Sequence, residues 1–218
     1  MKCRYCNSPN IIKYGHQQNG KVRYHCKSCL RYFQGSYRYQ SFVTEDKAII
    51  SLTKESCGIR SISRILNISS STVIRRTKKI AKGLTRPYPI LKGKCYEVDE
   101  LFTYVGHKKN RLCICYSLEP KSGEIIDIVV GKRNKKTLRK VTETLVLSDA
   151  QRITTDKLNI YKELIPIGTH STKLRGINHI ERKNLSLRTH IKRLNRKTLC
   201  YSKSAYMLYC VVKIYFWT

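Results

Sequence analysis

Acidic residues are scarce in this sequence: its 218 residues include 14 Asp and Glu against 44 Lys and Arg, a formal charge of +30. Such an excess makes a compact chain repel itself, and binding an acidic partner relieves that repulsion. The basic residues run along the whole chain instead of clustering beside an apolar segment, which favours nucleic acid over a membrane surface. We therefore expect the protein to bind a nucleic acid.

The sequence also lacks a long apolar run and an apolar leader. Met1-Lys2-Cys3 leads directly into a cysteine motif, and the longest apolar stretch, Ala205 to Trp217, is too short to span a bilayer. Four of the 10 Cys have metal-ligand spacing and the others are scattered, which is typical of a reducing compartment. We expect a cytoplasmic, nucleoid-associated protein with no membrane partner.

Changes in apolar periodicity divide the chain into segments. Residues 1–40 are rich in Cys, Tyr and basic side chains, whereas residues 44–83 have helical periodicity. Prolines in the segment 84–94 cannot continue a helix, so we interpret this segment as a linker. Residues 95–218 mix strand and helix patterns and predict an α/β domain.

Within this last domain the patterns place each element. We expect strands at 95–105, 111–119, 124–131, 151–155 and 166–170, and helices at 135–147, 158–164, 177–197 and 203–216. The helix 177–197 carries an apolar stripe that would face the core, made of Ile177, Ile180, Leu187, Ile191 and Leu194.

Two Cys-x2-Cys pairs, Cys3 with Cys6 and Cys26 with Cys29, enclose 19 residues. Each pair presents two thiolates on a tight turn, and two such turns complete a tetrahedron around zinc. About forty residues bury too little apolar surface to fold alone, so the metal would supply the missing stability. We predict a zinc ribbon with a structural Zn²⁺; two disulfides or unrelated thiols are the alternative.

The segment from Ile59 to Arg76 has the pattern of a helix-turn-helix. Asn67 stands where the turn needs a residue that tolerates the left-handed conformation, and Ser69 is a predicted N-cap of the second helix. The expected apolar faces are Ile62, Ile65 and Leu66 in the first helix and Val73, Ile74 and Ile80 in the second. The residues expected to contact DNA are Ser70, Ser71, Thr72, Arg75, Arg76 and Lys79. An ordinary helical hairpin is the alternative.

The few acids of the last domain occupy informative positions. Asp99 lies on its first predicted strand, Asp156 directly follows a short strand, and Glu181 lies near the start of the helix 177–197. Arg188 and Lys192 follow Glu181 by seven and eleven residues, on nearly the same side of the helix. A carboxylate followed by basic residues along one helical line suits a site that binds metal and then a phosphodiester.

Each acid also has an ordinary structural explanation. Asp156 would cap the helix that follows it, and Asp99 would pair with a basic neighbour. Asn178 and Glu181 have the spacing of a capping box. Spacing alone does not choose between these roles and a metal site.

Several stretches resemble the transposases of the insertion sequence 1 family, prokaryotic mobile elements whose enzyme is a DDE recombinase. The similar stretches are 98–101, 104–106, 108–110, 136–140, 155–156 with Tyr161, 180–188, 191–194, 196–198 and 201–204. The cysteine quartet and the helix-turn-helix pattern also match the N-terminal half of that family, so the resemblance covers nearly the whole chain. One departure is that Phe102 and Thr103 stand where many relatives have tryptophan.

The resemblance implies an RNase H-like catalytic domain whose Asp99, Asp156 and Glu181 hold two divalent cations, Mg²⁺ or Mn²⁺. Arg188 matches the basic residue that this group carries seven positions after the glutamate, and with Lys192 it would clamp the DNA backbone. The implied activity is cleavage and strand transfer of double-stranded DNA, with terminal inverted repeats and target DNA as partners. Bringing two ends together implies a homo-oligomer.

Three other functions remain open. The first is a non-enzymatic DNA-binding regulator, in which the last domain serves oligomerisation. The second is a nuclease of similar fold that cleaves without joining, because both reactions use the same acids. The third is a tyrosine recombinase with Tyr161 or Tyr201 as nucleophile, which also needs a cluster of Arg and His that is not evident.

Overall fold

The computed structural model describes residues 1–18, 20–35, 43–86, 92–173 and 176–218. The chain forms two compact units, Met1–Val43 and Thr44–Thr218. The predicted end of the zinc ribbon at residue 40 lies outside the described residues, as does the centre of the predicted linker with Pro87 and Pro89.

The first unit is a small antiparallel sheet. Its strands β1 (Ile11–His16), β2 (Val22–Cys26) and β3 (Tyr32–Gln34) pair in that order. The core on one face of this sheet consists of Cys3, Cys26 and Phe33, with Ile11, Tyr24 and Cys29 packed against them. So small a core cannot stabilise the unit by apolar burial alone.

Three helices open the second unit: α1 (Val43–Lys54), α2 (Ile59–Ile65) and α3 (Ser70–Gly83). Asn67 in the turn has φ 51°, and the Ser69 hydroxyl accepts a hydrogen bond from the Thr72 N–H at 3.1 Å, as the sequence predicts. The core of these helices is Ile49, Ile62 and Val73.

Two apolar residues of this region do not face the core. Ile65 is 58% exposed and Ile74 is 36% exposed, so their predicted inward positions are wrong. Ile65 is turned about 80° from the mean direction of Ile62 and Leu66, because each helical residue adds 100°. The same step places Ile74 beside the buried line and leaves Thr77 to fill it.

A five-stranded mixed sheet forms the centre of the second unit, with order β6-β5-β4-β7-β8. Strands β4 (Cys95–Tyr104), β5 (Arg111–Leu118) and β6 (Ile125–Gly131) are antiparallel neighbours. The short strands β7 (Arg152–Thr154) and β8 (His170–Ser171) continue the sheet in parallel to β4. The segment 166–169 forms a turn, so the strand predicted at 166–170 begins only at His170.

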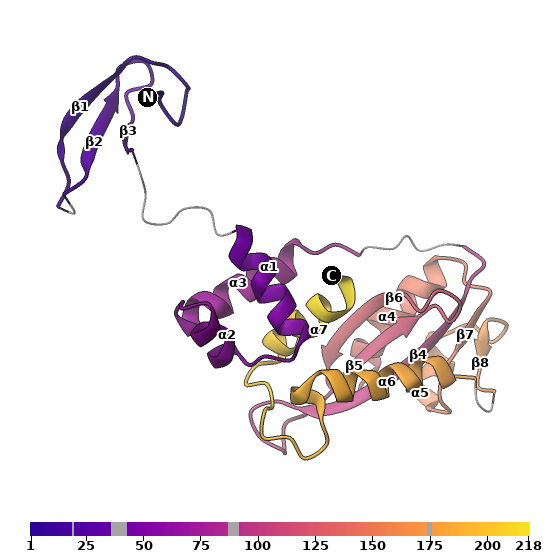
Figure 1. The fold of residues 1–218 in the computed structure, drawn as a ribbon. Helices are drawn as coiled ribbons and strands as arrows, with labels where there is room; N and C mark the ends of the chain where they lie inside the picture. The colour runs from indigo at the N-terminus through magenta and orange to yellow at the C-terminus, as the bar shows by residue number, and fades with distance from the viewer. Residues whose placement is uncertain (19, 36–42, 87–91, 174–175) are drawn as a thin grey trace. The chain divides into compact units, whose positions relative to one another are not determined.

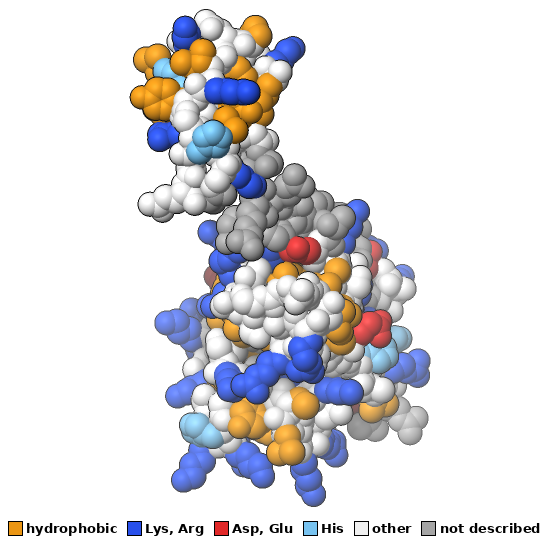
Figure 2. Space-filling model, turned by 60° about the vertical axis from the view of Figure 1, so that its left-hand side comes forward, with side chains coloured by type: hydrophobic (Ala, Val, Ile, Leu, Met, Phe, Trp, Pro, Cys, Tyr) orange, Lys and Arg blue, Asp and Glu red, His pale blue; other side chains and the backbone are white. Residues whose placement is uncertain are grey.

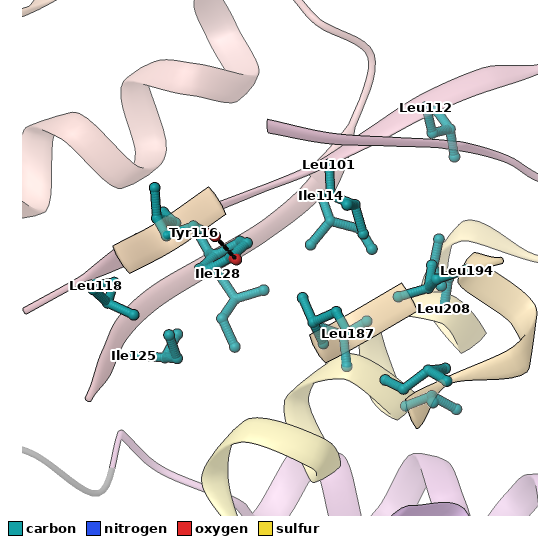
Figure 3. Close-up of a cluster of buried hydrophobic side chains, with 14 of the residues drawn as sticks. Leu101, Leu112, Ile114, Tyr116, Leu118, Ile125, Ile128, Leu187, Leu194 and Leu208 are labelled. Carbon is teal, nitrogen blue, oxygen red and sulfur yellow. Dashed lines mark hydrogen bonds between the residues drawn. The ribbon is translucent and has the colours of Figure 1, made fainter. Parts of the chain in front are cut away.

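Helices cover both faces of the sheet (Figure 1). On one face α4 (Lys135–Leu147) and α5 (Asn159–Leu164) bury a core with Val98, Cys115 and Ile153. On the other face lie α6 (Asn178–His190) and α7 (Ala205–Trp217). Figure 3 shows this second core, where Ile114 and Tyr116 of the sheet lie opposite Leu187 of α6 and Leu208 of α7. The mixed α/β class predicted from the sequence is therefore correct.

The predicted helix 177–197 is wrong in its second half. Helix α6 ends at His190, Ile191 is extended (φ −110°, ψ 94°), and a 3-10 turn follows at Lys192–Leu194. The Lys192 N–H donates to the Ser56 Oγ at 2.6 Å, whereas in a continuing helix it would donate to the carbonyl four residues back. A contact with the α1–α2 region thus replaces the next turn of the helix.

Helix α7 contacts α3 on one side and β6 on the other. Ala81 of α3 shares a buried cluster with Cys210 and Ile214 of α7. The packing joins the first three helices to the sheet in one compact unit. Among the described residues, no helix combines the length and the apolar character needed to cross a bilayer.

Candidate functional site

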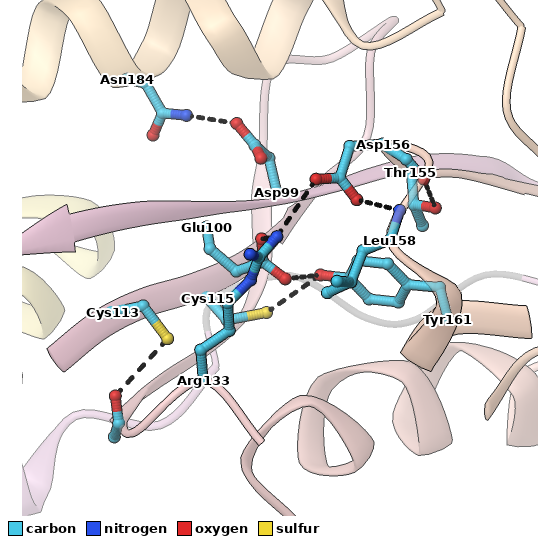
Figure 4. A network of polar contacts seen from close by, with 11 residues as sticks. Asp99, Glu100, Cys113, Cys115, Arg133, Thr155, Asp156, Leu158, Tyr161 and Asn184 are labelled. Atoms are coloured by element: carbon cyan, nitrogen blue, oxygen red, sulfur yellow. Dashed lines mark hydrogen bonds and ion pairs between the residues drawn. The ribbon is translucent and has the colours of Figure 1, made fainter. Parts of the chain in front are cut away.

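The pairing of β4 with β7 brings distant acids together. These strands run parallel with Glu97 opposite Thr154, after which β7 ends and β4 continues through Asp99 and Glu100. Asp156 therefore follows β7 beside this part of β4. One carboxylate oxygen from each of Asp99, Glu100 and Asp156 lies within 4.8 Å of the other two (Figure 4). We call these three residues the acidic cluster.

Hydrogen bonds from the α6 side of the sheet orient the Asp99 carboxylate. The Asn184 amide of α6 donates to its Oδ2 at 2.7 Å, and the Tyr116 hydroxyl donates to the Asn184 Oδ1 at 2.8 Å. Burial, together with the charges of Glu100, Asp156 and Glu181, raises the pKa of Asp99 to about 6. A bound cation would relieve this crowding of negative charge.

Glu100 was not predicted as a site residue. Its side chain is 1% exposed, the Tyr161 hydroxyl donates to its Oε1 at 2.5 Å, and burial raises its pKa. Alternation along a strand places Glu100 on the face opposite Asp99, and for that reason the sequence suggested no shared site. The two side chains still converge on Asp156, because β7 has ended there. The bond to Glu100 and burial assign Tyr161 a structural environment instead of a nucleophilic one.

Arg133, in the connection between β6 and α4, is the cation of the acidic cluster. Its Nη2 lies 3.5 Å from the Glu100 Oε2 and 3.4 Å from the Asp156 Oδ2. Its guanidinium lies over the Phe102 ring, 5.2 Å from the centroid. Nothing in the local sequence distinguishes Arg133 from the many other basic residues of the chain, so sequence reasoning missed it.

Neither capping alternative is found in the structure. The Asp156 Oδ1 accepts from the Leu158 N–H at 3.0 Å, but this bond lies before the helix, and α5 begins after Leu158 with no side-chain cap. The predicted capping box of Asn178 and Glu181 is wrong, because α6 begins after Ile177 with no side-chain cap. Glu97 takes that role instead: its Oε2 accepts from the Ile180 N–H at 2.8 Å.

Glu181 and Arg188 lie on α6, near the acidic cluster but outside it. Glu181 is exposed in the first turn, and its charge contributes to the raised pKa of Asp99. Arg188 donates to two backbone carbonyls, Leu194 O at 3.0 Å and Phe102 O at 3.3 Å. An open cavity of about 480 Å³ beside it is lined by further basic residues, namely Lys108, Arg111, Arg196 and Lys197. The Lys192 side chain is exposed.

The four predicted zinc ligands converge in the first unit. The Sγ atoms of Cys3 and Cys29 are 3.6 Å apart, as are those of Cys6 and Cys26. Zinc–sulfur bonds of about 2.3 Å in a tetrahedron place sulfur atoms about 3.8 Å apart, so the cluster fits zinc, and the spacing is too wide for disulfides.

The ionisation of these thiols also favours a cation. Burial opposes a charge on Cys26, but the N–H groups of Cys29 and Ser28 bring its pKa down to about 6. Although the Ser8 N–H acts in the opposite direction, burial and the neighbouring thiols raise the pKa of Cys6 to about 12. A bound cation would offset the charge of the neighbouring thiols that raises the pKa of Cys6.

The six predicted DNA-contacting residues of α3 differ in their exposure. Ser71, Arg75 and Lys79 are exposed, and Ser70 and Thr72 are half-buried.

Arg76, also predicted to contact DNA, is buried in the structure. It is 7% exposed, and its Nη1 lies 2.5 Å from the Asp46 Oδ1 of α1. Arg76 follows the buried Val73 by one helical turn, so it faces inward, where an acidic partner compensates its charge.

Comparison with known proteins gives a family match and several similar proteins. A sequence model of the family described as IS1 transposase matches residues 93–217, which include the acidic cluster. The insertion element iso-IS1n protein InsB of Shigella dysenteriae is 35% identical over 108 residues, covering 50% of this chain and 82% of that protein. The insertion element IS1 protein InsB of Shigella sonnei is 34% identical over 110 residues, covering 50% and 84%.

A solved structure was also matched, with a weaker similarity. It is a cryoEM structure of the simian T-cell lymphotropic virus intasome in complex with the PP2A regulatory subunit B56 gamma. The sequences are 16% identical, and the match covers 66% of this chain and 59% of that one, with a TM-score of 0.34.

Proposed function

This chain belongs to the IS1 transposase family, and from that premise we propose that it binds the ends of a mobile element and catalyses metal-dependent DNA cleavage and strand transfer. The observation that carries the proposal is the convergence of Asp99 and Asp156 from parallel strands, with Glu181 close enough to shift the pKa of Asp99. A regulator that only binds DNA does not need these carboxylates to meet.

Asp99, Asp156 and Glu181 are the proposed ligands of two divalent cations. Carboxylate oxygens are hard donors, which favours Mg²⁺ or Mn²⁺ over zinc. Such cations would activate water or a DNA 3′-hydroxyl and stabilise the departing oxygen. The Asn184 amide fixes the orientation of the Asp99 carboxylate, and Glu100 supplies a further carboxylate to the site.

Basic residues around the acidic cluster would hold the DNA backbone. Arg133 bridges Glu100 and Asp156, and a phosphate that approaches these acids meets its guanidinium. Arg188 and Lys192 lie farther along the α6 region, and the open basic cavity beside Arg188 suits a phosphodiester chain. We propose that Arg188 orders the end of β4 through the Phe102 carbonyl and contacts the flanking backbone.

The rest of the chain would recognise and organise the DNA. We propose that α2 and α3 act as a helix-turn-helix whose Ser71, Arg75 and Lys79 reach the major groove, and that the first unit is a zinc ribbon with a structural Zn²⁺. The antiparallel strands continued by parallel β7 and β8 support an RNase H-like fold. Terminal inverted repeats and target DNA are the proposed partners, a homo-oligomer the proposed assembly, and the nucleoid the proposed location.

Cleavage and joining of DNA that carries the element's ends, in the presence of Mg²⁺, tests this function. We compare wild type with Asp156→Asn, a near-isosteric change that removes a charge from the cluster, and with Asp149→Asn, the same change at an acid whose side chain is 70% exposed. Cleavage with joining that is lost only in Asp156→Asn supports a transposase. If all three folded proteins bind the ends and none cuts, also with Mn²⁺, the regulator function is favoured instead.

A further inference from the structure

The sheet of the first unit has an outward face rich in aromatic rings. Side chains alternate along a strand, so Tyr14, His25 and Tyr32 point away from the face that buries Cys26 and Phe33. The His25 and Tyr32 rings stack at 4.5 Å, and the Tyr14 ring lies 5.1 Å from Tyr32. Tyr14 is 52% exposed and Tyr32 is 41% exposed. Rings this exposed add little to the stability of the unit.

Arg23 completes this surface. Its guanidinium lies over Tyr32, 4.2 Å from the ring centroid, and its Nε is buried with no hydrogen-bond partner among the described residues. An open hollow of about 480 Å³ adjoins it, lined by the polar side chains of His16, Gln17 and Gln18 together with Arg23. We call Tyr14, Arg23, His25 and Tyr32 the aromatic face.

The charge around the aromatic face has one sign. Residues 1–43 contain no Asp or Glu and eight basic residues, which are Lys2, Arg4, Lys13, Lys21, Arg23, Lys27, Arg31 and Arg38. Four thiolates on a Zn²⁺ ion would offset only two of these charges. On the side of this unit seen in Figure 2, basic and hydrophobic side chains alternate and no acidic one appears. The surface therefore complements a polyanion that also offers flat apolar groups.

We propose that the aromatic face binds the unpaired bases of single-stranded DNA. Stacked rings beside cations are the surface on which successive bases stack, whereas a duplex hides its base faces inside the helix. The hollow next to Arg23 offers an imidazole and amides to base edges or phosphate. The inference rests on the proposed function only for its choice of DNA, because cutting and joining strands at an end exposes unpaired nucleotides.

A crosslinking experiment locates the contact on the full chain. The probe is an oligothymidylate of about ten nucleotides in which one base is 5-iodouracil, which crosslinks to aromatic side chains stacked on it. We expect irradiation to yield crosslinked peptides that contain Tyr14 or Tyr32. Crosslinks confined to the second unit would overturn the proposal.

Binding measurements then test stacking itself. We expect Tyr32→Ala to weaken the oligothymidylate about 5- to 150-fold at a salt concentration that suppresses non-specific binding, and Tyr32→Phe to restore most of the affinity. An abasic strand of equal length, which keeps the phosphates, should bind wild type as weakly as the normal strand binds Tyr32→Ala. The abasic strand should bind wild type and Tyr32→Ala with the same affinity, because it has no bases to stack on the Tyr32 ring.

Tyr5→Ala is the matched control. Tyr5 is 51% exposed and lies 5.1 Å from the Arg31 guanidinium, but it packs on Phe33, on the opposite side of the sheet. It should bind the oligothymidylate like wild type, and zinc content verifies that every variant keeps its ribbon. The proposal would be overturned if wild type bound the abasic strand as tightly as the normal strand. It would also be overturned if wild type bound a duplex of the same length more tightly than the single strand.

These outcomes are separate from those of the cleavage assay. If the protein cuts and joins DNA but binds the abasic strand as tightly as the normal strand, the proposed function is supported and binding of bases by the aromatic face is rejected. If the protein binds the normal strand more tightly than the abasic strand but does not cut, base binding by the aromatic face is supported and the proposed cleavage activity is rejected.

Discussion

The cysteine cluster and the acidic cluster are built in opposite ways. The cysteines are soft ligands on two short turns, and the most distant contacting pair is separated by only 26 residues. The acids are hard ligands that come from β4 and from the end of β7, and only the sheet brings them together. A local ligand set fixes one metal by itself, whereas a dispersed set depends on the whole second unit.

The two clusters also differ in how completely protein groups fill them. Four sulfurs would complete a tetrahedron around a metal ion and leave no position for a substrate, as is typical of structural zinc sites. The acidic cluster has three close carboxylates, a partly exposed Asp156 and the positive charge of Arg133 beside them. Such an incomplete shell leaves room for a phosphodiester.

The largest effect is expected at the acidic cluster. Asp99→Asn should lower the cleavage rate by about 10³-fold or more, because a metal-binding charge is lost from the reacting centre. Zinc content should stay at the wild-type level, since the cysteine cluster folds from its own ligands. Cleavage is followed on end-bearing DNA and zinc by elemental analysis, with Asp149→Asn as the control. Loss of zinc in Asp99→Asn would break the separation of the two sites.

The reciprocal change is Cys26→Ser. It removes a buried ligand, so the first unit should lose its zinc and unfold, and end binding should weaken. The second unit should stay folded, as measured by thermal unfolding and limited proteolysis. Cys200→Ser, at an exposed free thiol, should change neither property. Unchanged zinc content in Cys26→Ser would exclude the assignment of this residue as a ligand.

Acidity should weaken divalent-cation binding at the acidic cluster. The pKa of Asp99 is raised to about 6, and a cation binds the charged carboxylate, so affinity is fully present above pH 6 and is lost as pH falls through it. Below that value the Mn²⁺ affinity should fall by up to about tenfold per pH unit, as titration calorimetry would measure. Asp99→Asn should flatten this dependence. A flat profile in wild type would contradict the raised pKa.

The smallest effect concerns Arg133. Its guanidinium competes with a cation for Glu100 and Asp156, so Arg133→Ala should raise Mn²⁺ affinity about two- to fivefold, the size of a partly exposed ion pair. Arg139→Ala, at an exposed position of α4, is the control for net charge. Weaker Mn²⁺ binding in Arg133→Ala would show that the arginine orders the acids more than it competes for them.

The sequence predicted local features well. The cysteine spacing, the turn at Asn67 and the cap at Ser69 depend on neighbours in the chain, and the structure has the cysteines clustered and both turn features in place. Most helices and strands of the second unit were also located, because their periodicity is strong.

Features that depend on tertiary contacts were missed. Arg133 and Glu100 join the acids only because β7 ends where it does, and a single strand pattern cannot reveal that end. The same limit explains Arg76, whose partner Asp46 is 30 residues away, and the break at Ile191, where Ser56 replaces a helical acceptor.

Helix α7 fixes the distance between α3 and the central sheet of the second unit. It contacts both α3 and β6, and the bond from the Lys192 N–H to Ser56 adds a link between the segment after α6 and the α1–α2 connection. The packing therefore fixes the distance between α3 and the acidic cluster, which a flexible linker would not do. DNA bound to α3 would meet the carboxylates at a constant number of base pairs from the bound sequence. After base pairs are inserted or deleted between the recognised sequence and the original cleavage site, the protein should still cut at the same distance from the recognised sequence. The cut should therefore move away from the originally cleaved bond by the number of base pairs inserted or deleted.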